Sequence, residues 1–143
     1  MTPRKPRGKA RISPLELVRA AANLALDKKA EDAVILDLRR FSLGCDYFLI
    51  ASGTSGPHVR GIADWIEERL GTEHSEFPWH REGTATARWI LLDYVDVVLH
   101  IFQAEVRETY MLERLWGDAP VERIAATALG GLGEPTGGLG EEP

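Results

Sequence analysis

Apolar residues recur with two different periods along the chain, and these periods predict an alternation of helices and strands. Helical spacing of three or four residues begins after Ser13 and again after Ser55. The segment 13–16 (Ser-Pro-Leu-Glu) offers an N-cap serine, a proline at the first helical position and a capping-box glutamate. We therefore predict one helix from this segment to about Lys29, and a second from Ser55 to Gly71.

Short apolar segments rich in β-branched or aromatic residues predict the strands of one sheet. They lie at 33–38, 47–51, 89–93 and 95–102, and one further short strand is expected within 72–88. The strands at 89–93 and 95–102 are so close that only a tight hairpin around Tyr94 can join them. Along 95–102 the odd-numbered residues should share one face of the sheet, and the even-numbered residues the other.

The helical pattern continues to residue 116 and fades after Asp118. Residues 105–116 predict a last helix, after which a weakly helical stretch at 121–129 precedes two copies of Gly-Gly-Leu-Gly-Glu. Such glycine-rich sequence buries too little apolar surface to offset the entropy lost on ordering. We therefore interpret the chain as a basic flexible arm (1–12), one α/β domain with a mixed β-sheet flanked by helices (13–118), and a tail that is weakly helical and then disordered (119–143).

The charge distribution separates the arm from the rest of the chain. The net charge is −5, yet residues 1–11 contain five of the 17 basic residues and no acidic one. The remainder holds 12 basic and 22 acidic residues, a net charge of −10. An acidic body suits a basic protein partner better than a phosphate backbone, whereas the arm is either a solvated tail or a minor contact to RNA.

Cysteine usage and hydropathy limit where the protein works. Cys45 is the single cysteine, so no intrachain disulfide can form, and its apolar surroundings predict a small buried side chain. A lone cysteine fits a reducing compartment, and we expect a cytoplasmic protein. No run of 18 apolar residues predicts a membrane span.

Three features could carry chemistry, and none of them identifies an enzyme. The loop 52–56 (Ser-Gly-Thr-Ser-Gly) precedes a helix and is either a helix-start turn or an anion cradle, but it lacks the lysine of a Walker loop. Asp93 and Asp96 are either turn residues of the hairpin or a metal pair. His100 is interpreted as a hydrogen-bonded structural histidine, and the histidines and the cysteine show no zinc spacing. We expect no cofactor and no metal.

Trp65 points towards binding instead of catalysis. It lies off the apolar stripe of its helix, so it is predicted at the edge of that stripe or exposed, and exposed tryptophans often mark contact surfaces.

Three longer motifs resemble the ribosomal silencing factor (RsfS, Iojap) family. They are the segment 45–55 leading into 58–64, the segment 89–102 (Trp-Ile-Leu-Leu-Asp-Tyr-Val-Asp-Val-Val-Leu-His-Ile-Phe), and the segment 105–116. Together they cover about residues 13–118, and their order and length make the resemblance specific.

The resemblance implies a non-enzymatic protein with a sheet shaped like that of nucleotidyltransferases but without their catalytic residues. It implies binding to the large ribosomal subunit through that subunit's protein number fourteen, steric blocking of small-subunit joining under nutrient limitation, and a homodimer when free. The partner-binding positions that it implies in this chain are Trp89, Asp93, Tyr94, Asp96 and Tyr110.

One residue of the hairpin departs from the family pattern. Val95 stands where the family usually has glycine, so we expect the turn either to differ in shape or to use a non-glycine conformation, which would alter the contact geometry of Tyr94 and Asp96. Two other functions stay open: a factor for assembly of the large subunit, and a metal-dependent nucleotidyltransferase that uses the loop 52–56 with Asp93 and Asp96.

Overall fold

The computed structural model describes residues 12–41, 43–111, 114 and 117–124. Helix α1 (Pro14–Asp27) is followed by β1 (Glu31–Asp37), the short 3-10 helix η1 (Arg39–Phe41) and β2 (Tyr47–Gly53). Helix α2 (Gly56–His74) leads to β3 (His80–Glu82), β4 (Trp89–Asp93) and β5 (Val97–Gln103). Helix α3 (Ala104–Tyr110) and β6 (Val121–Ile124) complete the described elements. None of the described helices is long and apolar enough to cross a membrane.

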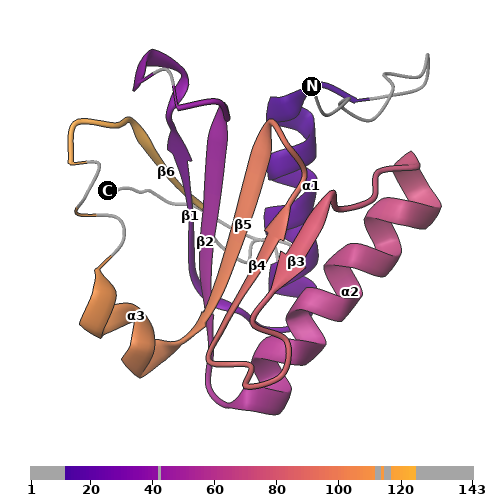
Figure 1. Ribbon diagram of the computed structural model, residues 1–143, viewed down its shortest axis with the longest axis vertical. Coiled ribbons are helices and arrows are strands. Elements are labelled where there is room, and N and C mark those ends of the chain that lie inside the picture. Colours follow the sequence, from indigo (N-terminus) through magenta and orange to yellow (C-terminus); the bar gives the residue numbers. More distant parts are fainter. Residues whose placement is uncertain (1–11, 42, 112–113, 115–116, 125–143) are drawn as a thin grey trace, which may run out of the picture.

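The strands form one mixed sheet in the order β3-β4-β5-β2-β1-β6. Strands β2 and β5 pair in parallel, and the other four pairings between described strands are antiparallel. Figure 1 shows α1 and α2 side by side on one face of the sheet, and the short α3 on the other. The predicted fold class, an α/β domain with a mixed sheet flanked by helices, is confirmed.

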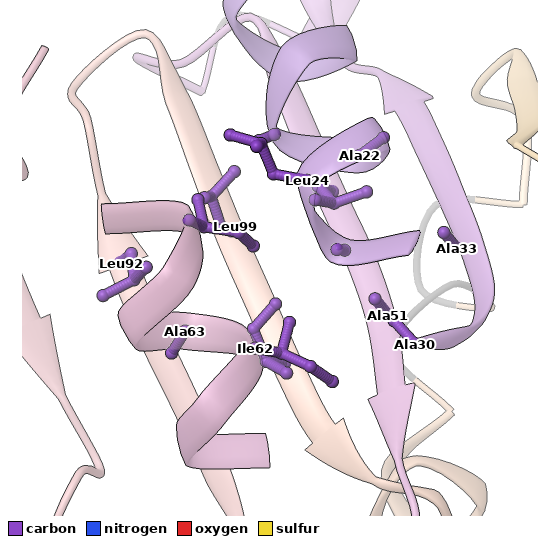
Figure 2. Packing of buried hydrophobic residues seen from close by; sticks show 14 of the residues in the cluster. Ala22, Leu24, Ala30, Ala33, Ala51, Ile62, Ala63, Leu92 and Leu99 are labelled. Carbon is purple, nitrogen blue, oxygen red and sulfur yellow. The ribbon is translucent and has the colours of Figure 1, made fainter. Parts of the chain in front are cut away.

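The main core fills the space between the sheet and the helices α1 and α2. Small side chains of α1, such as Ala22, and branched ones of α2, such as Ile62, belong to one buried cluster with Leu92 and Leu99 of the sheet (Figure 2). All of these side chains are fully buried. Alanines on α1 let that helix approach the sheet closely, because a packed interior leaves no room for larger groups.

Both predicted helix starts are confirmed by their caps. The Ser13 hydroxyl accepts a hydrogen bond from the Glu16 amide at 3.1 Å, and the Glu16 carboxylate accepts one from the Ser13 amide at 2.9 Å, which completes the capping box. At α2, the Ser55 hydroxyl accepts from the His58 amide at 3.2 Å. These bonds satisfy amides that the helices leave without partners.

The loop before α2 is a helix-start turn and not an open anion cradle. The Thr54 amide, which would face an anion, donates to Nδ1 of His58 at 2.8 Å. The Nε2 atom of the same ring lies 2.7 Å from the Lys28 carbonyl oxygen at the end of α1. His58 therefore joins the start of α2 to the end of α1 across the sheet face.

Trp65 lies at the edge of the buried stripe of α2, which is one of the two positions that the sequence predicts. Its ring packs against the main core, and its indole N–H donates to the Asp27 carboxylate at 3.3 Å. Lys28 and Arg69 lie over the ring, 4.6 and 5.3 Å from its centre. Trp65 therefore connects α1 with α2, so its proposed role as a contact residue loses its support.

The predicted ends of two helices are wrong. Helix α2 continues past Gly71 to His74, because Phe77 packs its ring on Gly71 where a Cβ would lie 2.8 Å away, and Ser75 supplies the left-handed cap at φ 56°. Helix α3 ends at Tyr110 instead of residue 116. Met111 adopts φ 48° and its amide donates to the Arg107 carbonyl, so the backbone turns away there.

The weakly helical stretch predicted from residue 121 begins as a strand. Residues 121–124 form β6, which pairs antiparallel with β1 and so gives that strand a second hydrogen-bonding neighbour. The Arg19 guanidinium makes two hydrogen bonds to the Glu122 carboxylate at 2.9 and 3.2 Å, and Ile124 packs against the main core. Tertiary pairing thus overrides the weak helical preference. The basic arm and the Gly-rich segments lie outside the described residues.

Replacing His58 with alanine tests its role as the connection between the two helices. We expect His58→Ala to lower the free energy of unfolding by about 1 kcal/mol, because two backbone groups lose a hydrogen-bond partner. Urea unfolding followed by circular dichroism measures the change. His80→Ala is the matched control, since the exposed His80 side chain hydrogen-bonds to the exposed Glu82 carboxylate, and it should cost less than about 0.5 kcal/mol. Equal costs for the two variants would show that His58 makes no such connection.

Candidate partner-binding surface

The face of the sheet that is turned away from α1 and α2 is covered over only part of its width. On the β1 and β2 side, Val34, Leu36 and Ile50 are buried in a second small core with Ala119. On the β4 and β5 side, Trp89, Leu91, Asp93 and Val98 are only half-buried, whereas His100 and Phe102 on the same face are buried beneath them. Alternation along β4 explains this, since Ile90 and Leu92 point into the main core while their neighbours point to the other face.

We name this half-buried area the β4–β5 surface and define it by the outward-facing residues Phe48, Trp89, Leu91, Asp93 and Val98. The strand register sets Asp93 beside Val98, and Val98 beside Phe48, in one row across three strands. Leu91 lies in the next row, beside His100. The surface is therefore an apolar strip with a carboxylate at one end.

His100 is buried beneath the β4–β5 surface and holds Trp89 in place. It is 4% exposed, and its Nδ1 atom accepts a hydrogen bond from the Trp89 indole N–H at 3.1 Å. The rings of Phe48 and Phe102 pack around it, with centroid distances of 4.5 and 6.2 Å. Burial lowers the pKa of His100 to about 4, so the ring is neutral near pH 7 and can accept from Trp89. The prediction of a hydrogen-bonded structural histidine is confirmed.

Carboxylates gather at the hairpin end of the β4–β5 surface. The Asp46 amide donates to the Asp96 carbonyl at 2.7 Å, which places these two residues together. Cys45 lies among them: burial, together with the charges of Asp46, Asp93 and Asp96, raises the pKa of its thiol to about 11. The thiol is thus protonated and unreactive at neutral pH. This end of the surface is negatively charged.

The structure shows which conformation the hairpin turn adopts with valine at position 95. The Asp93 carboxylate accepts a hydrogen bond from the Val95 amide at 2.7 Å, so Asp93 is a turn residue. Val95 itself adopts φ 76°, the left-handed conformation that glycine tolerates and a β-branched residue does not. The expected non-glycine conformation is therefore wrong, because Val95 is held under strain at a φ that suits glycine.

The structure places the five predicted partner-binding residues in three different settings. Trp89 and Asp93 belong to the β4–β5 surface, and Asp96 is half-buried at its acidic end. Tyr94 is 2% exposed and belongs to the main core, where burial raises the pKa of its hydroxyl. Its side chain is therefore not part of the exposed surface, and its role in partner binding stays a prediction. Tyr110 ends α3, but its side chain lies outside the described residues.

Phe48 and Leu91 are members of the surface that the sequence analysis missed. Both lie in strands whose sequence is almost wholly apolar, so burial on both faces was the natural interpretation. The usable signal was the alternation of Trp89, Leu91 and Asp93 at every second residue. The metal-pair hypothesis gains nothing here, because the described residues contain no group of three or more His, Cys, Asp or Glu side chains suited to a metal ion.

Comparisons with known proteins give the family. The family model described as "Ribosomal silencing factor during starvation" matches residues 11–135. The chain belongs to the ribosomal silencing factor family. The match extends past residue 118 and covers β6.

Individual members of the ribosomal silencing factor family are similar over most of their length. A ribosomal silencing factor of Halalkalibacterium halodurans is 42% identical over 113 residues, which is 79% of this chain and 96% of that protein. One of Bacillus subtilis is 43% identical over 105 residues, 73% of this chain and 88% of that protein. A crystal structure of a Bacillus halodurans protein has a TM-score of 0.66 at 38% identity, and the likeness covers 77% of this chain and 99% of that one.

The strain at Val95 predicts a stabilising substitution. Val95→Gly should raise the free energy of unfolding by about 1 kcal/mol, because relief of left-handed strain exceeds the entropy cost of glycine. Val95→Ala is the control, since alanine keeps a Cβ at the same φ and should gain less. Urea denaturation of all three proteins gives the order, and an alanine variant as stable as the glycine variant would contradict the strain argument.

The lowered pKa of His100 predicts a loss of stability in mild acid. The unfolded chain takes up a proton near pH 6.5 while the folded protein resists until about pH 4, so His100 stabilises the fold above pH 6.5. This contribution falls as the pH drops from 6.5 towards 4. Urea unfolding at pH 7.5, 6.0 and 5.0 should show a smaller decline for His100→Gln than for the unsubstituted protein. Parallel declines would rule His100 out as the cause.

Proposed function

We propose that the protein binds the large ribosomal subunit and blocks joining of the small subunit, which represses translation when nutrients are limiting. Membership of the ribosomal silencing factor family supports this function most directly. We further propose that contact is made through the large subunit's protein number fourteen. A protein that acts by occlusion needs affinity and bulk but no catalytic groups.

The β4–β5 surface is the proposed contact area. Half-buried apolar side chains in a row, with an aromatic residue among them, are typical of the centre of a protein interface. Trp89 is held by its hydrogen bond to His100, so it loses little freedom on binding. A rigid apolar strip therefore faces outward without any cost of reorganisation.

The negative charge of the β4–β5 surface suits the proposed contact with a basic ribosomal protein. The acidic end of the β4–β5 surface contains Asp46, Asp93 and Asp96, and the chain outside its basic arm has a net charge of −10. Ribosomal proteins are mostly basic, so attraction would speed the encounter and orient the two proteins. A minor contact of the basic arm with ribosomal RNA, and a homodimer of the free protein, remain predictions.

A substitution in the middle of the apolar strip tests the proposal. Leu91→Lys should weaken binding to the large subunit at least about 100-fold, because it buries an unpaired positive charge against a basic partner. The measurement is sucrose-gradient sedimentation of purified large and small subunits with each protein. The unsubstituted protein should sediment with the large subunit and reduce the joined particle, and the variant should do neither.

Val121→Lys is the matched control for this experiment. It puts the same side chain in place of an exposed apolar one, on β6 at the far edge of the sheet, and should bind normally. Normal binding by a folded Leu91→Lys protein would show that the contact lies elsewhere. Binding without any effect on joining would favour assembly of the large subunit as the main task.

A further inference from the structure

A cavity of about 390 Å³ lies on the α3 side of the sheet, apart from the residues that define the β4–β5 surface. Its polar lining comprises Asp32, Ser52, Arg107, Glu108, Arg114 and Arg123. These residues come from β1, the end of β2, α3 with the segment after it, and β6. Its volume falls in the range of small-molecule sites.

The topology of the sheet makes this a favourable place for a ligand. Strands β2 and β5 are parallel neighbours, and each is followed by a helix. Helix α2 leaves β2 for one face of the sheet, whereas α3 leaves β5 for the other (Figure 1). Where the connections of adjacent parallel strands diverge in this way, a crevice forms at the carboxyl ends of the strands, and α/β proteins bind ligands there.

Arg107 is built into the floor of the cavity. It is 8% exposed, and its Nη1 atom donates to the Asp32 carbonyl at 2.7 Å and to the Ser52 hydroxyl at 2.8 Å. Ser52 is itself 2% exposed. These bonds hold the guanidinium in one orientation, so the positive charge is fixed before any ligand arrives.

The rim of the cavity is positively charged in a protein that is acidic as a whole. Arg114 and Arg123 are exposed, and neither forms an ion pair with a carboxylate in the described part of the chain. The lining thus contains three arginines and two carboxylates, so it is positively charged, whereas the chain as a whole has a net charge of −5. Arginine is the residue best suited to phosphate, because its planar donors can make two parallel hydrogen bonds to phosphate oxygens.

We propose that this cavity binds the phosphate groups of a small, nucleotide-sized molecule. Arg107 supplies the fixed charge at the floor, and Arg114 and Arg123 close on the phosphates from the rim. The site requires no metal ion and no chemical step. The residues that line it are different from those that define the β4–β5 surface.

Calorimetric titration of the full-length protein with inorganic pyrophosphate and with ATP, both in excess EDTA, tests the proposal. We expect binding of both probes by the unsubstituted protein. The double variant Arg114→Gln/Arg123→Gln should weaken it at least about tenfold, since each lost charge-assisted hydrogen bond is worth about that factor. Arg40→Gln, which removes one exposed charge in η1 outside the cavity lining, should change the affinity less than about twofold.

Amide chemical shifts in ¹⁵N-labelled protein locate the bound probe. Pyrophosphate should shift the amides of Ser52 and Arg107, and shifts confined to residues 1–11 would overturn the proposal by assigning the binding to the basic arm. Absence of binding at millimolar probe, or an equal loss in the Arg40→Gln control, would overturn it as well. So would binding of a short single-stranded RNA without binding of either small probe.

Discussion

The parallel pairing of β2 with β5 is the constraint on which the arrangement of this protein depends. Parallel neighbours cannot be joined by a tight turn, so the chain must leave the sheet between them and return. Here it does so through α2, β3 and β4, which adds two strands beyond β5 and fills one face with a helix. The same pairing sets the carboxyl ends of β2 and β5 side by side, with α2 and α3 on opposite faces. One face of the sheet is consequently covered by the long helices α1 and α2, and the other face remains partly exposed.

Local signals in the sequence were sufficient for the parts of the fold that depend on neighbouring residues. The capping box at Ser13, the cap at Ser55 and the alternation along β5 all act over a few positions, and all three are present in the structure. The elements that were mispredicted depend on distant contacts. Strand β6 exists because β1 offers it an edge, and Gly71 lies inside α2 because the ring of Phe77 occupies the space beside it. Neither contact leaves a signature in the adjacent sequence.

The candidate surface could be predicted only in part, for a related reason. Asp93 and Trp89 stand out as a polar residue at a turn and a large aromatic residue in a strand, and both lie on the exposed face. Tyr94 has an equally conspicuous side chain, but the left-handed turn at Val95 directs the hairpin so that Tyr94 packs into the core. The direction of a side chain within a tight turn depends on backbone angles that composition does not reveal. The half-buried positions of Phe48 and Leu91 depend on which distant elements cover that face of the sheet, and the residues next to them in the sequence do not show this.

The edges of the sheet limit how this protein can associate with itself. The outer strand β3 has only three residues, His80, Arg81 and Glu82, all charged or titratable and all exposed, and β6 at the opposite edge has four residues with Glu122 and Arg123 among them. Short edge strands with charged side chains disfavour the addition of another strand. Addition of one copy to another by strand pairing at β3 or β6 is therefore disfavoured, even though an apolar strip is half-exposed. A partner of either kind, a second copy or another protein, is better accommodated on the face of the sheet than along its edges.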